Sequence, residues 1–219
     1  MDAPSIGLTE LELDALTELV NLGVSNAAFS LREMVKEEVI LSVPKVSLVS
    51  CDEAISILGE QATRRLVAVQ QNFDGAINGR ALLIFPEVNS LELVRAVVGG
   101  APSLEDIAEL EQEALAETGN VLLNGCLGTI ANILNRTLKI SLPEVIYGES
   151  GDFFKEPPPR SASDRVLFVY INFALRGGDL KGYIAMLLDI PSLRTLQQLL
   201  KELIENIAGQ TSISKTHVD

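Results

Sequence analysis

The sequence predicts an α/β protein of the α+β type, in which one mainly antiparallel sheet is flanked by helices. Of the 219 residues, 47% are hydrophobic, which is enough to form a substantial packed core. Segments with helical periodicity alternate with runs rich in β-branched residues. The order helix, strand, hairpin, helix occurs twice along the chain. We therefore expect a single domain over residues 1–219 with an internal pseudo-two-fold repeat, in which two long helices carry the functional sites.

The first half of the repeat is expected at about residues 8–100. A long helical pattern opens it, and Thr9 followed by Glu12 predicts a capping box at its start. A β-branched run follows, then a short segment, then two strands joined by a turn, and then a helix that begins at a proline. In order, we expect a helix at 8–37, a strand at 39–50, a short helix or turn at 51–60, strands at 65–73 and 80–85, and a helix from Pro86 to Gly99–Gly100.

The second half is expected at about residues 103–208. Ser103 and Asp106 are the candidate caps of its long helix. A loop rich in glycine and proline precedes the hairpin, and residues 209–219 are expected to form a flexible tail. In order, we expect a helix at 103–136, a strand at 138–147, a loop at 148–163 with Pro157–Pro159, strands at 166–175 and 182–188 around Gly177–Gly178, and a helix from Pro191 to about Ala208.

A polar motif recurs at the same place in the two halves. An acidic residue is followed four residues later by Glu, three residues after that by Asn, and 23 residues later by Pro. Each residue of the second copy lies 99 positions after its counterpart in the first. Similar composition of helix–strand units does not explain identical spacing, so we interpret the motif as a duplication. The first copy is Asp14, Glu18, Asn21 and Pro44, and the second is Glu113, Glu117, Asn120 and Pro143.

The Glu and Asn of each copy fall on one helix face, one turn apart. At about 100° per residue, both pairs lie roughly opposite the apolar stripe of their helix, so we expect them to face away from the core. A solvated helix face would also explain any single pair of this kind. Asn is a poor helix former, however, so its occurrence in both copies favours a functional role. Pro44 and Pro143 cannot donate to a β-ladder, and each is expected to mark a strand edge or a bulge.

Glycines inside the two long helices are expected to allow close helix packing. Each costs about 1 kcal/mol relative to Ala in a helix interior, so a packing reason is needed. Gly119 precedes Asn120, and the missing side chain loosens the helix there, which would either admit a partner loop more closely or reduce the order of the Asn120 amide. The glycines assigned to packing are Gly23, Gly125 and Gly128.

Composition excludes several classes of chemistry. The net charge of −13 disfavours binding to nucleic acid and to anionic membrane surfaces. His217 is the only histidine, so His-based triads and His-ligated zinc lack their residues. Cys51 and Cys126 form no CxxC pair and are expected as reduced core thiols of a cytoplasmic protein. We predict neither a signal peptide nor a segment that spans a membrane.

An exposed Glu and Asn can still support one kind of reaction. A carboxamide has a donor and an acceptor, so it can hold and orient a water molecule. It is too weak a base to activate a difficult reaction, but in-line placement of water suffices for a reactive substrate such as an acyl phosphate. An exposed helix face implies that another protein carries this substrate, and the Glu would then anchor a cation of that partner.

With these residues, the chain resembles the CheC/CheX/FliY family of chemotaxis phosphatases, and within it the CheC branch, which carries two such sites at about this length. The resembling pattern is [Asp/Ser]-x3-Glu-x2-Asn-x22-Pro, present twice. The repeated plan of helix, strand, hairpin and helix extends the resemblance over essentially the whole chain. The first copy matches at every position, whereas Glu113 of the second stands where the family has Asp or Ser.

The resemblance implies dephosphorylation of CheY-phosphate or a similar receiver domain. It implies that Asn21 and Asn120 orient the attacking water, and that Glu18 and Glu117 pair with a lysine of the receiver. No cofactor of its own is implied, because the Mg²⁺ belongs to the receiver, and the deamidase CheD is a further expected partner. The alternative is a non-catalytic adaptor that binds a receiver or a CheD-like protein without turnover. Intact Glu and Asn in both copies favour the enzyme.

Overall fold

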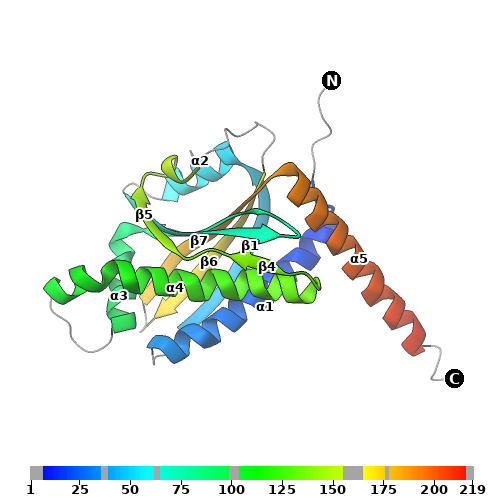
Figure 1. Ribbon diagram of the computed structural model, residues 1–219, viewed down its shortest axis with the longest axis horizontal. Helices are drawn as coiled ribbons and strands as arrows, with labels where there is room; N and C mark the ends of the chain where they lie inside the picture. Colours follow the sequence, from blue (N-terminus) through cyan, green and yellow to red (C-terminus); the bar gives the residue numbers. More distant parts are fainter. Residues whose placement is uncertain are drawn as a thin grey trace.

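An antiparallel seven-stranded sheet forms the centre of the fold (Figure 1). The computed structural model describes residues 7–35, 39–61, 65–98, 104–154, 165–175 and 178–215. The strands pair in the order β1-β6-β7-β3-β2-β4. β5 lies on the same edge of β2 as β4 and pairs with the first half of β2, whereas β4 pairs with its end. They are β1 (Val39–Ser50), β2 (Leu66–Gly75), β3 (Gly79–Pro86), β4 (Leu138–Ile140), β5 (Glu144–Gly148), β6 (Arg165–Leu175) and β7 (Gly178–Leu188). The predicted mainly antiparallel sheet is confirmed.

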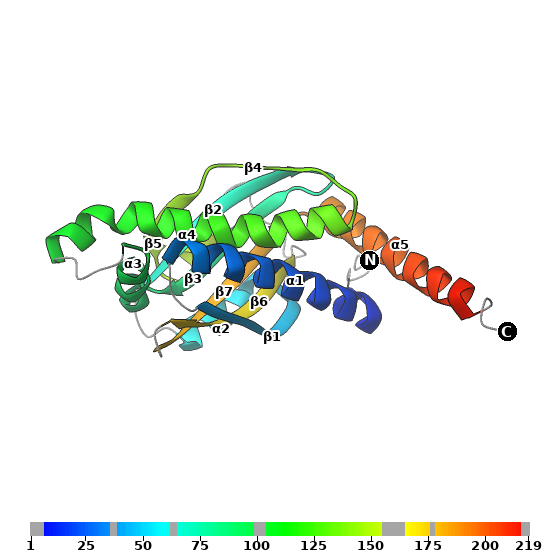
Figure 2. The ribbon, with the colours of Figure 1, turned by 90° about the horizontal axis from the view of Figure 1, so that it is seen from below.

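Helices cover both faces of this sheet, so the fold has three layers (Figures 1 and 2). Two long helices, α1 and α4, lie side by side across one face, and α3 and α5 pack around the same core. The short helix α2 and the 3-10 turn η2 cover the opposite face. The bounds are α1 (Glu10–Val35), α2 (Cys51–Gln61), η1 (Glu87–Asn89), α3 (Ser90–Val98), α4 (Leu104–Ile133), η2 (Asp152–Phe154) and α5 (Ile190–Lys215).

The central strands are buried on both faces. In β2, Val67 and Val69 belong to the core beneath α1 and α4, while Leu66 and Ala68 belong to the core beneath α2. Successive side chains of a strand point to opposite faces, so a strand that is covered on both sides is apolar at most of its positions. The continuous apolar runs of the sequence therefore form antiparallel strands without the polar alternation of a half-exposed sheet.

Small residues bring α1 and α4 into close contact. A Cβ on Gly23 would lie 2.8 Å from the Cα of Cys126, and a Cβ on Gly125 would lie 2.7 Å from the Cβ of Ala27. The prediction that Gly23 and Gly125 allow close packing is therefore confirmed, but it is wrong for Gly128, which faces open space. Burial raises the pKa of the Cys126 thiol to about 12, as expected for a core thiol that takes no part in chemistry.

The two motif prolines stand at irregularities of the edge strands. The pairing of β1 with β6 shifts between Ser42 and Lys45, where two residues of β1 oppose one of β6. The strand predicted at 138–147 is divided into β4 and β5, and residues 141–143 between them oppose two residues of β2. Each proline thus lies in a segment with one extra residue, which is the geometry of a β-bulge. The prediction that Pro44 and Pro143 mark a strand edge or bulge is confirmed.

Other boundaries differ from those predicted for physical reasons. Pro86 still pairs with Leu66 at the end of β3, so the following helix begins later, as η1 and then α3. The last helix continues past Ala208 to Lys215, because Gly209 is not followed by a proline that would end it. Residues 51–61 form a helix, with Cys51 half-buried at its start. Ser103, Pro157–Pro159 and Gly177 lie outside the described residues.

The arrangement of the strands in the sheet has two-fold symmetry between the two predicted halves of the chain. β1 pairs with β6 at one edge, β4 and β5 pair with β2 at the other, and β3 pairs with β7 at the centre. Exchange of each strand with its counterpart in the other predicted half leaves this order unchanged. This is compatible with the 99-residue repeat, which remains a prediction about the origin of the chain.

The capping box at the start of α1 is confirmed and extends to α5. The N–H of Thr9 donates to Glu12 Oε2 at 2.8 Å, and the N–H of Glu12 donates to Thr9 Oγ1 at 3.3 Å. Gln197 Nε2 of α5 donates to the same Glu12 oxygen at 3.1 Å. Burial raises the pKa of Glu12, but the hydrogen bonds from Thr9 and Gln197 and the charge of Lys201 outweigh it, so its pKa lies below the usual value.

We expect the Glu12→Ala variant to lose about 1 kcal/mol of unfolding free energy at about pH 7, as for other helix caps. A carboxyl whose pKa is lowered by folding stabilises fully above its unfolded pKa of about 4.3 and loses this contribution as the pH falls through the folded value. The difference between wild type and variant should therefore shrink below about pH 4. Urea unfolding at neutral and acidic pH measures it, and a pH-independent difference would contradict the assignment.

Candidate functional site

One face of α4 carries the second copy of the polar motif. Glu113 and Glu117 are exposed, and neither forms an ion pair within the described part of the chain. Asn120 and Asn124, one and two turns further on, are half-buried. The two glutamates thus point away from the core, as predicted, and the half-buried Asn120 lies at the border between solvent and the edge of the sheet.

A polar network lies beneath Asn120. Its Oδ1 accepts hydrogen bonds from Gln71 Nε2 of β2 at 3.1 Å and from Asn124 Nδ2 at 2.8 Å. Gln71 is only 1% exposed, and the same Nε2 also donates to the carbonyl oxygen of Ser141 at 2.9 Å. The Asn120 oxygen is thus held by protein donors, while its amino group remains for a ligand at the helix surface.

Gly119 sets how closely α4 approaches the sheet. A Cβ at this position would overlap the Val69 side chain of β2, including its branched carbon. The glycine therefore serves packing against β2, and the prediction that it admits a partner loop is wrong, because Val69 occupies that space. The close approach allows the adjacent Asn120 to reach Gln71.

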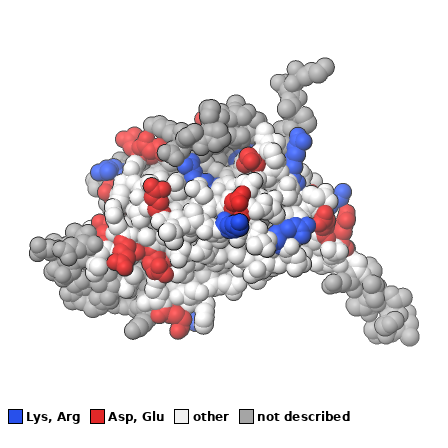
Figure 3. All heavy atoms as spheres, in the orientation of Figure 1, with Lys and Arg blue, Asp and Glu red and all other residues white. Residues whose placement is uncertain are grey.

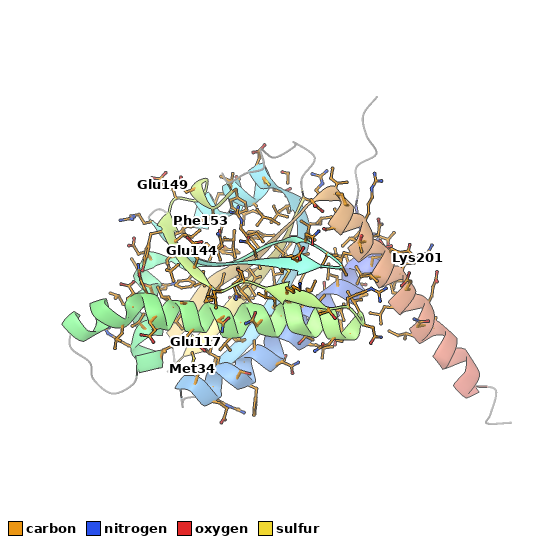
Figure 4. All side chains as sticks on the ribbon, in the orientation of Figure 1. Met34, Glu117, Glu144, Glu149, Phe153 and Lys201 are labelled. Carbon is orange, nitrogen blue, oxygen red and sulfur yellow. The ribbon has the colours of Figure 1, made fainter. Side chains whose placement is uncertain are left out.

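A hollow of about 360 Å³ opens beside Glu117 at the junction of α1, α3 and α4. Its wall is mostly apolar, and Glu113 and Glu117 contribute two carboxylates. Figure 4 shows Glu117 on α4 near Met34 at the end of α1. In Figure 3, acidic side chains gather over the part of α4 nearest to α3, and basic ones lie toward its other end. The hollow is lined by Met34, Val97, Leu110, Glu113, Ala114 and Glu117.

One face of α1 carries the first copy of the motif. Asp14 and Glu18 are exposed, and Asn21 is half-buried, as predicted for a face away from the core. The Asn21 carboxamide forms no hydrogen bond with any residue that the structure describes. The two copies therefore present the same pair of side chains, but only the asparagine of α4 is fixed by neighbours.

The two Glu–Asn faces are separate surfaces. α1 and α4 run in opposite directions (Figures 1 and 2), so the first turns of one lie near the last turns of the other. Glu117 shares its hollow with Met34, which lies sixteen residues beyond Glu18 on α1. At about 1.5 Å per residue this corresponds to about 24 Å along the helix. Two partners could therefore be engaged independently.

Neither copy of the motif has metal ligands around it. Among the described residues, no three His, Cys, Asp or Glu side chains lie close enough together to hold a metal ion. Within the same residues, no helix is long and apolar enough to cross a membrane.

Gln71 is the site residue that the sequence analysis missed. The only signal is the polar run at residues 70–72, which interrupts the apolar residues between Leu66 and Phe73. Residues 69–73 of β2, Val-Gln-Gln-Asn-Phe, are similar to residues 169–173 of β6, Val-Tyr-Ile-Asn-Phe. In this comparison Ile171 corresponds to Gln71. Asn120 and Gln71 are 49 residues apart, so only the folded chain places them in contact.

The chain's resemblance to the chemotaxis phosphatases of the CheC/CheX/FliY type is confirmed by the relatives that it matches. It is 27% identical over 153 residues to the CheY-P phosphatase CheC of Bacillus subtilis, covering 68% of this chain and 73% of that protein. It is 23% identical over 186 residues to the flagellar motor switch phosphatase FliY of the same organism, covering 82% of this chain but only 47% of FliY. No protein-family model matches the chain.

Solved structures show the same fold. The crystal structure of Thermotoga maritima FliY matches with a TM-score of 0.73 at 19% identity, over 90% of this chain and 100% of that one. FliM in its complex with SpeE from H. pylori matches with a TM-score of 0.64 at 9% identity, over 90% and 97% of the two chains. At such low identity these likenesses concern the fold alone, which is shared by proteins with different names.

We expect Gly119→Ala to lower the free energy of unfolding by about 1–3 kcal/mol, because the added methyl group overlaps Val69 and forces α4 away from β2. Gly128→Ala is the matched control on the same helix, where a Cβ meets open space. At that position the better helix propensity of alanine should raise the free energy of unfolding by about 0.4–1 kcal/mol. Equilibrium urea unfolding compares the two, and equal effects would contradict the packing role of Gly119.

Proposed function

We propose that this protein is a phosphatase that hydrolyses the aspartyl phosphate of a phosphorylated, CheY-like response regulator in chemotaxis signalling. The observation that carries the proposal is the paired presentation of the motif. An exposed Glu and a half-buried Asn lie one turn apart on each of two antiparallel helices. The curated name of the CheC relative, CheY-P phosphatase, supports this assignment. We place the activity in the cytoplasm, where such a substrate would be met.

The reaction needs little chemistry from this protein. A water oxygen bonds to phosphorus as the bond from phosphorus to the aspartyl oxygen breaks, which gives inorganic phosphate and a free carboxylate, and the water proton is released. Asn21 or Asn120 would orient this water in line with the leaving carboxylate. An acyl phosphate is reactive enough for such placement to accelerate its hydrolysis. The Mg²⁺ that neutralises phosphoryl charge would belong to the receiver domain, and no cofactor of this protein is proposed.

The glutamates would anchor the partner. Neither Glu18 nor Glu117 has an ion-pair partner in the described chain, so each can accept a cation from outside. At the α4 site, the hollow of about 360 Å³ combines an apolar wall with Glu113 and Glu117. This suits a lysine of the receiver, because its methylene chain can pack on apolar surface while its ammonium meets a carboxylate. Electrostatic attraction of this kind mainly increases the rate of association.

A second function is a non-catalytic adaptor that binds a receiver or a CheD-like protein without turnover. The shared fold with FliM, which was solved in complex with other proteins, supports this alternative. Retention of both Glu–Asn pairs favours the enzyme, because an adaptor surface has no need of the same pair at the same spacing twice. A CheD-like partner is compatible with either function.

We expect the double variant Asn21→Ala plus Asn120→Ala to lose the phosphatase activity while it keeps the fold, because no carboxamide remains to orient water. Each single variant should keep a share, and the two losses should add, since the two faces are separate. The measurement is steady-state phosphate release from a phosphorylated CheY-like receiver, with circular dichroism as the control for folding. Wild-type release by the double variant would exclude this mechanism, and complete loss in one single variant would exclude two working sites.

We expect Glu18→Lys plus Glu117→Lys to weaken binding of a receiver that carries a phosphoryl mimic, because a receiver lysine would then meet a like charge. The loss should be larger at about 0.01 M than at about 1 M salt, since exposed charge pairs are screened. Reversal of both Glu10 and Glu53, two exposed glutamates outside the motif, changes the net charge by the same amount and is the matched control. Titration calorimetry at both salt concentrations measures the effect, and binding unchanged from that of the control would exclude the anchor role.

A further inference from the structure

We propose that Gln71 is a positioning residue of the α4 site, and that the break in the edge strand at Pro143 holds it there. The inference deepens the proposed phosphatase function and rests on it. It assigns a role to a buried side chain outside the motif, and it connects Asn120 with the motif proline 23 residues further along the chain.

The first step is the break in the edge strand. β4 pairs with β2 up to Ile140 opposite Phe73, and β5 resumes pairing at Glu144 opposite Gln70. Residues 141–143 therefore stand opposite only Gln71 and Asn72. Proline has no N–H to donate and cannot continue the ladder at this point. Next to this break, the N–H of Asn72 donates to Ser141 Oγ at 2.9 Å, and the carbonyl oxygen of Ser141 accepts its hydrogen bond from the side chain of Gln71 at 2.9 Å.

The second step is the orientation of Gln71. One side-chain nitrogen donates both to Ser141 and to Asn120, so the amide plane of Gln71 is fixed between a strand and a helix. Its Oε1 is buried and has no hydrogen-bond partner within the described residues. A buried acceptor without a partner is unfavourable for folding. The residue is therefore better explained by what its nitrogen does for Asn120 than by stability.

The third step is the effect on Asn120. With Oδ1 held by Gln71 and Asn124, the carboxamide is fixed in one orientation, and its amino group, which has no hydrogen-bond partner among the described residues, would hold the water. A group that is already oriented does not lose rotational freedom in the reaction. The position opposite the Pro44 bulge is occupied by Ile171, which is fully buried and cannot donate a hydrogen bond. Positioning of this kind is therefore specific to the α4 site.

The test uses Gln71→Met, which keeps an unbranched side chain of similar length and removes the donor, in two backgrounds. In the Asn21→Ala background only the α4 site remains, and kcat for phosphate release from a phosphorylated CheY-like receiver should fall about tenfold or more, with KM unchanged. In the Asn120→Ala background only the α1 site remains, and the same substitution should have no effect. Ile171→Met is the matched control at the corresponding step of β6 and should leave both kcat and KM unchanged.

A second measurement does not depend on turnover. In ¹⁵N–¹H spectra, the side-chain amide signals of Asn120, identified by their loss in Asn120→Ala, should shift in Gln71→Met and remain in place in Ile171→Met. The midpoint of thermal unfolding should not fall in Gln71→Met, since a buried acceptor without a partner is removed along with the donor.

The outcomes distinguish failure of the positioning role of Gln71 from failure of the proposed phosphatase function. Equal losses of activity in both backgrounds, no loss in the Asn21→Ala background, or no α4 activity in that background would each overturn the positioning role. Unchanged Asn120 amide signals would also overturn it. If the wild-type protein releases no phosphate from the receiver, the proposed phosphatase function fails, and the amide signals alone then decide whether Gln71 orients Asn120.

Discussion

The close approach of α4 to its neighbours is the constraint on which the rest of the structure depends. Gly125 lets the helix meet Ala27 of α1, and Gly119 lets it meet Val69 of β2. Both contacts require that no Cβ be present, so α4 is held between a helix and a strand at fixed distances. This placement leaves Glu113 and Glu117 in solvent and turns Asn120 toward the polar edge of the sheet. A helix a few ångströms further out would present the same residues without the contact to Gln71.

The two copies of the motif show how one pattern acquires different surroundings. Both helices offer an exposed Glu and an Asn one turn later, and both motif prolines lie in bulges of edge strands. The residue opposite the bulge is Ile171 in one case and Gln71 in the other. An apolar side chain can only pack, whereas an amide can donate across the space between strand and helix. The two Glu–Asn pairs are therefore alike, whereas the side chains that support them differ.

The acidic surface and the chemistry of the sites are consistent with each other. A phosphorylated receiver carries the reactive bond itself, so this protein needs only to bind it and to place a water. Carboxylates on the outer face of α4 can attract a cationic group of the partner, and the apolar hollow beside them can take up its methylene chain. The asparagine, half-buried and neutral, adds no negative charge next to a phosphoryl group. In the proposed function, the division between a charged anchor and a neutral amide would follow from the charge of the substrate.

The sequence alone determined the elements and the positions of the motif. Hydrophobic periodicity located the helices and strands, the Thr9–Glu12 pair marked the start of α1, and the fixed spacing to Pro44 and Pro143 marked the two bulges, because these signals act between residues close together in the chain. Tertiary structure decided how deeply Asn120 is buried, why Gly119 is a glycine, and that Gln71 belongs to the site. Helical periodicity gives the direction of a side chain relative to its own helix, but not the distance of that helix from the sheet. That distance depends on contacts between residues as far apart as Val69 and Gly119, which no local pattern encodes.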